Sequence, residues 1–123
     1  MTKAGTILVV DDNKGVLAAL EMLLSGTFKK VVTLSNPNCI LSVLETENVD
    51  VLLLDMNFSA GINTGNEGIF WLGEIRKFSK ELPIVLFTAY ADIELAVKAV
   101  KEGATDFVVK PWDNAKLVAT LLS

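Results

Sequence analysis

The stretch ILVVDDN, residues 7–13, decides the fold, because four apolar residues are followed at once by two carboxylates, Asp11 and Asp12. A second apolar run, VLLL at 51–54, also ends in an acid, Asp55. Short apolar runs of this kind are typical of buried strands in a parallel sheet. Parallel strands end at the same edge of a sheet, where open α/β sheets bind ligands. We therefore expect the three carboxylates to lie close together.

Apolar runs alternate with segments of helical period along the rest of the chain, which is the pattern of βαβ units. Further runs lie at 31–34, 84–87 and 107–109. Five such units fit into the 123 residues as one domain. Right-handed crossovers and short connections favour the flavodoxin-like strand order 2-1-3-4-5. The sequence thus predicts a single doubly wound (βα)5 sheet, whose switch point lies between the strands that end in Asp11 and Asp55.

Glycine positions and apolar spacing predict where the helices lie. Gly26 and Gly103 are expected to follow the first and fourth helices. Gly68 is interpreted as a loop residue before a third helix marked by apolar residues from Ile69 to Phe78. In the last helix, the spacing predicts that Leu122 faces inward.

Composition argues against several classes of function. Without histidine, the chain can form neither a Ser-His-Asp site nor a histidine metal site. Its single cysteine, Cys39, cannot form an internal disulfide, and it is interpreted as a small apolar residue on a helix. A net charge of −4 argues against nucleic-acid binding. The apolar runs are too short to span a membrane and no signal peptide is visible, so we expect a cytoplasmic protein.

The polar residues at the strand ends suit phosphoryl chemistry. Three neighbouring carboxylates repel one another unless a cation joins them, and an all-oxygen site suits Mg²⁺. Thr88 follows the run 84–87 and Lys110 follows the run 107–109, which adds a hydroxyl and an ammonium. Charge neutralisation of this kind is the main source of catalysis in phosphoryl transfer. Asp55 is the candidate nucleophile.

These residues and their surroundings resemble the response-regulator receiver domain of two-component signalling. The motifs are VVDDN at 9–13, LLLD at 52–55, LFTAYADIELAVKAVKEGATDF at 86–107 and KPW at 110–112. The similarity is greatest to receivers of enhancer-binding (NtrC-like) transcription activators. It implies one receiver domain over residues 1–123, cut from a longer regulator. It also implies a switch without enzymatic turnover, whose partners are a histidine kinase or phosphotransfer protein, an output domain and, in some cases, a second receiver.

The resemblance also implies roles for the residues at the strand ends. Asp55 would accept the phosphoryl group, with Lys110 assisting. Asp12 would bind Mg²⁺ directly, Asp11 would orient it partly through water, and the backbone carbonyl of Asn57 would supply a further ligand. The peptide bond that follows Lys110 would be cis.

Further residues would carry the response. Thr88 and Phe107 would form a switch pair that reshapes the face made by the fourth helix, fifth strand and fifth helix. For Phe107 an ordinary place in the core is an equally good interpretation. Tyr90 and Asn57 would set the lifetime of the acyl phosphate. Trp112 is expected to pack against the last helix.

The run 57–67 departs from the family pattern, since it is about five residues longer than short βα loops allow and has Ser59 where a proline is usual. It is either a tolerated insertion or a surface that affects partner choice. Two other functions stay open. One is an aspartate-nucleophile phosphatase of the haloacid-dehalogenase type, which would need an acid where Asn57 stands. The other is a receiver-like interaction module that accepts no phosphate.

Overall fold

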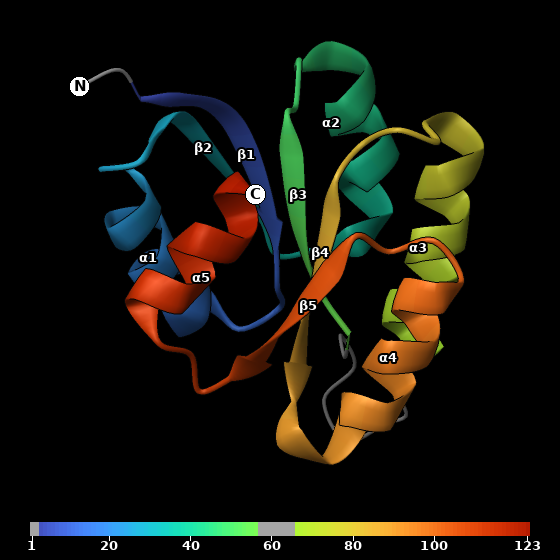
Figure 1. Cartoon of the computed structure of the whole chain (residues 1–123). Helices are drawn as coiled ribbons and strands as arrows, with labels where there is room; N and C mark the ends of the chain where they lie inside the picture. Colours follow the sequence, from blue (N-terminus) through green and yellow to red (C-terminus); the bar gives the residue numbers. More distant parts are fainter. Residues whose placement is uncertain (1–2, 57–65) are drawn as a thin grey trace.

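The computed structural model describes residues 3–56 and 66–123. Five parallel strands form one sheet in the order β2-β1-β3-β4-β5, which confirms the predicted flavodoxin-like topology (Figure 1). The strands are β1 (Ala4–Val10), β2 (Phe28–Leu34), β3 (Val51–Asp55), β4 (Ile84–Ala89) and β5 (Asp106–Lys110).

Helices cover both faces of the sheet (Figure 1). One face packs against α1 (Lys14–Leu24) and α5 (Asn114–Leu122). The other packs against α2 (Ile40–Thr46), α3 (Asn66–Phe78) and α4 (Ile93–Lys101). Short 3₁₀ turns, η1 (Pro37–Cys39) and η2 (Tyr90–Asp92), precede α2 and α4. Within the described ranges, no helix is both long and apolar enough to cross a membrane.

The apolar runs are continuous because the central strands are buried on both faces. Along β1, Ile7 and Val9 pack on the side of α1 and α5, while Leu8 and Val10 pack on the side of α2, α3 and α4. This alternation follows from the two-residue repeat of a strand. Burial on both faces is typical of parallel sheets. Because the central strands are buried on both faces, the polar residues that follow each strand mark the edge of the sheet.

Capping side chains stabilise the starts of two helices. The Asn13 side chain accepts from the backbone N–H of Val16 at 3.1 Å at the start of α1. The Asp113 carboxylate does the same for Lys116 at 3.1 Å at the start of α5. Gly103 follows α4 with a φ of +137°, a backbone conformation that favours glycine.

Three expectations about individual residues are wrong. Gly68 lies inside α3 rather than in a loop, and a Cβ there would stand 2.6 Å from the Cα of Met56. The absence of a side chain at Gly68 therefore allows α3 and the end of β3 to lie in close contact. Leu122 is 53% exposed, because Leu117 and Leu121, four residues apart, already occupy the inward face of α5. Cys39 is exposed in η1.

Candidate metal site at the carboxyl edge of the sheet

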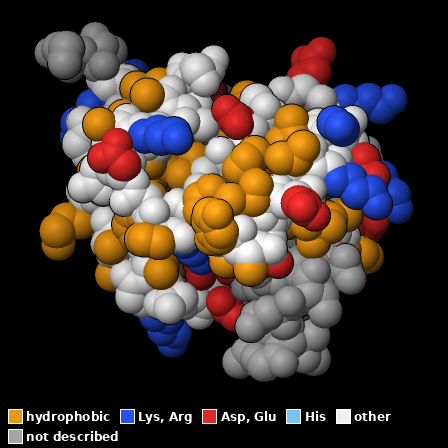
Figure 2. Space-filling model, turned by 60° about the horizontal axis from the view of Figure 1, so that its bottom comes forward, with side chains coloured by type: hydrophobic (Ala, Val, Ile, Leu, Met, Phe, Trp, Pro, Cys, Tyr) orange, Lys and Arg blue, Asp and Glu red, His pale blue; other side chains and the backbone are white. Residues whose placement is uncertain are grey.

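The sheet brings the predicted polar residues to one edge. Val10 pairs with Leu54 and Thr88 with Val109, so the residues at the ends of β1, β3, β4 and β5 lie at the same level. Figure 2 shows the molecule with this end turned forward, and acidic side chains gather near its lower centre. The expectation that Asp11, Asp12, Asp55, Thr88 and Lys110 share one edge agrees with this register.

Three carboxylates form the centre of the site. Asp11, Asp12 and Asp55 each present an oxygen, and these three oxygens lie within 4.8 Å of one another. Asp11 is 1% exposed and Asp55 is 5% exposed, whereas Asp12 is open to solvent. Asp11 Oδ1 accepts from the backbone N–H of Asn13 at 2.9 Å, which fixes its carboxylate. The carboxylates of Asp11 and Asp55 are thus buried, whereas the Asp12 carboxylate is accessible to solvent.

Lys110 joins the two buried carboxylates. Its Nζ donates to Asp11 Oδ2 at 2.7 Å and to Asp55 Oδ1 at 3.2 Å. The ammonium also lies 4.9 Å from the ring centre of Phe87, which packs against Trp112. The peptide bond between Lys110 and Pro111 is cis, as expected. One positive charge is therefore shared by two carboxylates, and bonds between charged groups are among the stronger hydrogen bonds.

The charges at this edge shift two pKa values. Burial disfavours the Lys110 ammonium, but its hydrogen bonds and charge interactions with Asp11 and Asp55 outweigh burial and raise the pKa of Lys110. Partial burial and then the negative charge of Asp11 raise the pKa of Asp12, against the opposing effect of Lys110. Glu67 adds to the rise in the pKa of Asp12. A further positive charge near Asp12 would therefore stabilise its ionised carboxylate.

The donor set fits a divalent cation that prefers oxygen. Within the described residues, the three carboxylates and the Lys110 ammonium bonded to two of them carry a formal charge of −2. Mg²⁺ is bound in proteins through one or two carboxylates and keeps several waters. Asp12 and Asp55 can supply these carboxylates, and Asp11 belongs to the same group of oxygens. The Asn57 carbonyl, expected as a further ligand, lies outside the described residues.

Of the residues expected to carry a response, Thr88 and Tyr90 lie at the carboxyl end of β4 and just after it, whereas Phe107 is the second residue of β5. Thr88 is buried, and its Oγ1 donates to the carbonyl of Ala89 at 3.2 Å. Phe107 on the neighbouring strand β5 is partly buried and packs against the core under α2, α3 and α4. Tyr90, at the start of η2, is 80% exposed. Trp112 packs against the core formed with α1 and α5, which agrees with its expected contact with the last helix.

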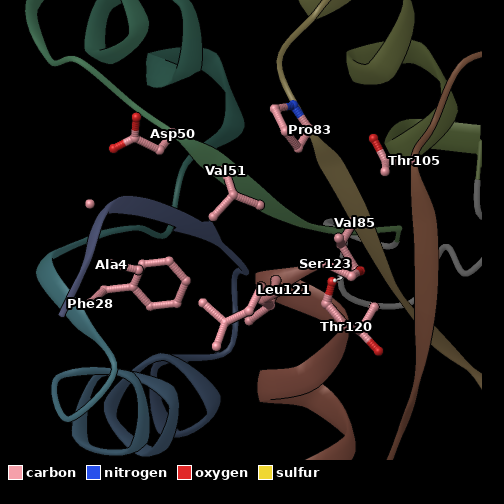
Figure 3. Close-up of a pocket in the computed structure, with 12 residues that line it drawn as sticks. Ala4, Phe28, Asp50, Val51, Pro83, Val85, Thr105, Thr120, Leu121 and Ser123 are labelled. Atoms are coloured by element: carbon pink, nitrogen blue, oxygen red, sulfur yellow. Dashed lines mark hydrogen bonds between the residues drawn. The ribbon is translucent and has the colours of Figure 1, made fainter. Parts of the chain in front are cut away.

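A separate hollow of about 270 Å³ lies at the opposite edge of the sheet (Figure 3). Residues at or near the starts of β1, β2, β3 and β4 line it together with the end of α5. Its one carboxylate, Asp50, accepts from the backbone N–H of Thr6 at 2.7 Å and so holds the start of β1. The other lining groups are apolar or hydroxyl side chains and backbone.

Sequence reasoning missed one residue near the cluster, Glu67, which it assigned to the long loop. In the structure Glu67 lies in the first turn of α3, and its charge acts on Asp12. Its Oε1 is buried without a hydrogen-bond partner, the one such side-chain atom in the described part of the chain. No sequence pattern marks this residue, because its position depends on how α3 packs against the end of β3.

Comparisons with known proteins agree with this fold. Residues 7–122 match the model of a family described as the response regulator receiver domain. The chain is 34% identical over 115 residues to the DNA-binding transcriptional regulator NtrC of Salmonella typhimurium, and 35% identical over 115 residues to the transcriptional regulatory protein ZraR of Klebsiella oxytoca. Each alignment covers 94% of this chain, and 24% and 25% of those proteins. The chain thus spans about a quarter of the length of these relatives.

Solved structures give the same result. The crystal structure of the N-terminal signal receiver domain of a two-component system response regulator from Bacteroides fragilis has a TM-score of 0.89 and 61% identity, covering 98% of this chain and 95% of that one. The receiver domain of NtrX from Brucella abortus has a TM-score of 0.83 and 29% identity, covering 95% of this chain and 98% of that one.

Proposed function

The chain belongs to the response regulator receiver domain family, and from that premise we propose that it is a phosphorylation-dependent signalling switch. Asp55 accepts a phosphoryl group from a histidine kinase or phosphotransfer protein. The change then passes to the face made by α4, β5 and α5, which controls an output domain. The domain acts in the cytoplasm and, like its family, signals rather than turning over a substrate.

The observation that carries the proposal is the Lys110 ammonium, bonded at once to Asp11 and Asp55. A carboxylate oxygen of Asp55 attacks phosphorus, and the bond from phosphorus to the donor breaks with its electron pair leaving on the donor. Lys110 is already within hydrogen-bond distance of Asp55, so its ammonium can neutralise the incoming phosphoryl oxygens without moving far. Buried Asp55 is also shielded from bulk water.

Asp11, Asp12 and Asp55, with the Asn57 carbonyl, are the groups that would hold Mg²⁺. When bound, the ion supplies the positive charge that phosphoryl transfer requires. Asp12 faces solvent and so offers the first contact for an entering ion. Asp11 is held by Lys110 and by the backbone N–H of Asn13, which suits an orienting role.

Thr88 and Phe107 are the proposed switch pair. Thr88→Ala should still accept phosphate, but it should lose most of the structural response because the hydroxyl that senses the phosphoryl oxygens is gone. NMR spectra with and without beryllofluoride, a phosphoryl mimic, measure this response at Phe107. Thr46→Ala is the matched control, since its hydroxyl donates to the carbonyls of Ser42 and Val43 within α2. Wild-type shifts around Phe107 in Thr88→Ala would refute the coupling.

Tyr90 is proposed to lengthen the life of the acyl phosphate, and Asn57 is proposed for the same property. The Tyr90 ring is free to lie over the carboxyl edge, since it is exposed at the start of η2. Tyr90→Ala should therefore lose label faster than wild type, whereas Tyr90→Phe, which keeps the ring, should not. Loss of label is followed by intact mass after removal of the donor. An equal or longer lifetime in Tyr90→Ala would count against shielding.

The output is proposed to be transcriptional, because two relatives carry the names of transcriptional regulators and are about four times longer than this chain. A second receiver is a further possible partner of the same face. A phosphatase of the haloacid-dehalogenase type is the alternative enzyme, and continuous release of phosphate from a small phosphoester would favour it. Asn57, in place of the acid that such enzymes use, argues against it.

A further inference from the structure

Glu67 is held beside the cation site by the way α3 begins. The backbone N–H of Gly68 donates to the carbonyl of Met56 at 3.0 Å, directly after Asp55. Because Gly68 has no side chain, the first turn of α3 presses against this backbone, and a Cβ there would lie 3.1 Å from the Asp55 carbonyl oxygen. The contact fixes the position of Glu67, the preceding residue, whose charge acts on Asp12 of the acid cluster.

One carboxylate oxygen of Glu67, Oε1, is buried without a hydrogen-bond donor among the described residues. Leaving a buried acceptor unsatisfied is unfavourable, and more so when the acceptor belongs to a charged group. Lys110, the cation of the acid cluster, is bonded to Asp11 and Asp55. An unsatisfied buried atom beside a cation site is the kind of group that a water or an ion satisfies.

We propose that Glu67 is a fourth carboxylate of the cation site, which binds Mg²⁺ through the ion's coordinated water rather than directly. The inference rests on the proposed function only in taking Asp11, Asp12 and Asp55 as the cation site. Glu67 would thereby strengthen cation binding before the phosphoryl group arrives.

Binding through water follows from the spacing of the oxygens. Glu67 contributes no oxygen to the group whose members lie within 4.8 Å of one another. Ligands of one Mg²⁺ ion stand 2.0–2.1 Å from it, so their oxygens can be no more than about 4.2 Å apart. Mg²⁺ keeps several waters when it binds protein, and these waters donate to nearby acceptors. Loss of an outer-shell partner typically lowers metal affinity by about 10–100-fold.

The test compares Mg²⁺ affinities of four proteins: wild type, Glu67→Gln, Glu74→Gln and Asp12→Ala. Bound and free Mn²⁺ are counted by electron paramagnetic resonance, and Mg²⁺ is titrated as the competitor. Glu74 is the matched control because it lies on the same helix, about 10 Å further along, and pairs with Lys77. Asp12→Ala is the positive control, since it removes a proposed direct ligand.

Glu67→Gln should weaken Mg²⁺ binding about tenfold, Asp12→Ala more than that, and Glu74→Gln less than about twofold. The Glu67 effect should persist in about 1 M salt, where the screening length falls to about 3 Å. Without Mg²⁺, Glu67→Gln should melt no lower than wild type, because the substitution removes an unsatisfied charge.

An affinity of Glu67→Gln within twofold of wild type would overturn the proposal. So would an effect that disappears in high salt, which would show a distant charge rather than a contact through water. A lower melting temperature of Glu67→Gln with unchanged affinity would show a structural role instead. These outcomes leave the proposed function intact if wild type is still labelled on Asp55, whereas failure of wild type to bind Mg²⁺ would overturn both.

Discussion

Lys110→Met is expected to lower the free energy of unfolding by about 3 kcal/mol in the absence of Mg²⁺. The substitution keeps an apolar stem of similar length but removes the only charge bonded to both Asp11 and Asp55 within the described residues. Removing one partner of a buried ion pair costs about 3–5 kcal/mol, because the other charge stays buried and unpaired. The lower end applies, since the Lys110 side chain is 26% exposed. Urea denaturation measures the loss.

Mg²⁺ should reverse part of that loss, because a divalent cation can replace the missing positive charge. The control is Lys116→Met on α5, which removes the charge of an exposed lysine and should change stability by less than about 0.5 kcal/mol. A Lys110→Met protein as stable as wild type without Mg²⁺ would show that the ion pair does not hold this edge together.

Lys110 should also make the stability of the folded protein depend on pH. The pKa of Lys110 is raised in the folded protein, so its contribution to stability is complete below the ordinary lysine pKa of about 10.4 and is lost as pH rises through the raised value. Wild type should therefore lose stability in that alkaline range more steeply than Lys110→Met. Equal slopes would contradict the assignment of the shift to the bonds with Asp11 and Asp55.

The parts of the fold that could be predicted are those that depend on local pattern. The run 7–10 is apolar on both faces of the strand, so it predicts a central parallel strand, and the acids after it must lie at the sheet edge. The same reasoning placed Thr88 and Lys110. Strand order followed because few right-handed topologies suit five short βα units. The all-oxygen donor set also indicated Mg²⁺ and phosphoryl chemistry, whereas the switch roles of Thr88 and Phe107 came from resemblance to a family.

The parts that could not be predicted depend on which elements touch. Gly68 matches no glycine motif and looks like a loop residue in the sequence, whereas in the structure its lack of a side chain lets α3 meet the end of β3. The position of Glu67 follows from that contact and was missed with it. Pattern also could not show that Lys110 bonds Asp11 as well as Asp55. Residues 57–65, with the expected Asn57 ligand and most of the long loop, lie outside the described residues.

Asp55→Asn is expected to abolish phosphorylation. This effect on activity should be as large as the effect of Lys110→Met on stability. The substitution is nearly isosteric, and its side-chain oxygen can still accept from Lys110, so the site should keep its shape. The amide, however, carries no charge and is a far weaker nucleophile than the carboxylate. Wild type and variant should have similar melting temperatures, so that loss of labelling reports chemistry rather than unfolding.

The measurement that tests the central claim most directly is the intact mass of wild type and Asp55→Asn after incubation with acetyl phosphate, with Mg²⁺ or with a chelator. Wild type should gain one phosphoryl group only when Mg²⁺ is present, and hydroxylamine should remove it, as expected for an acyl phosphate. Asp55→Asn should gain none. Equal labelling of the two proteins, or a label on wild type that resists hydroxylamine, would show that Asp55 is not the phosphoacceptor.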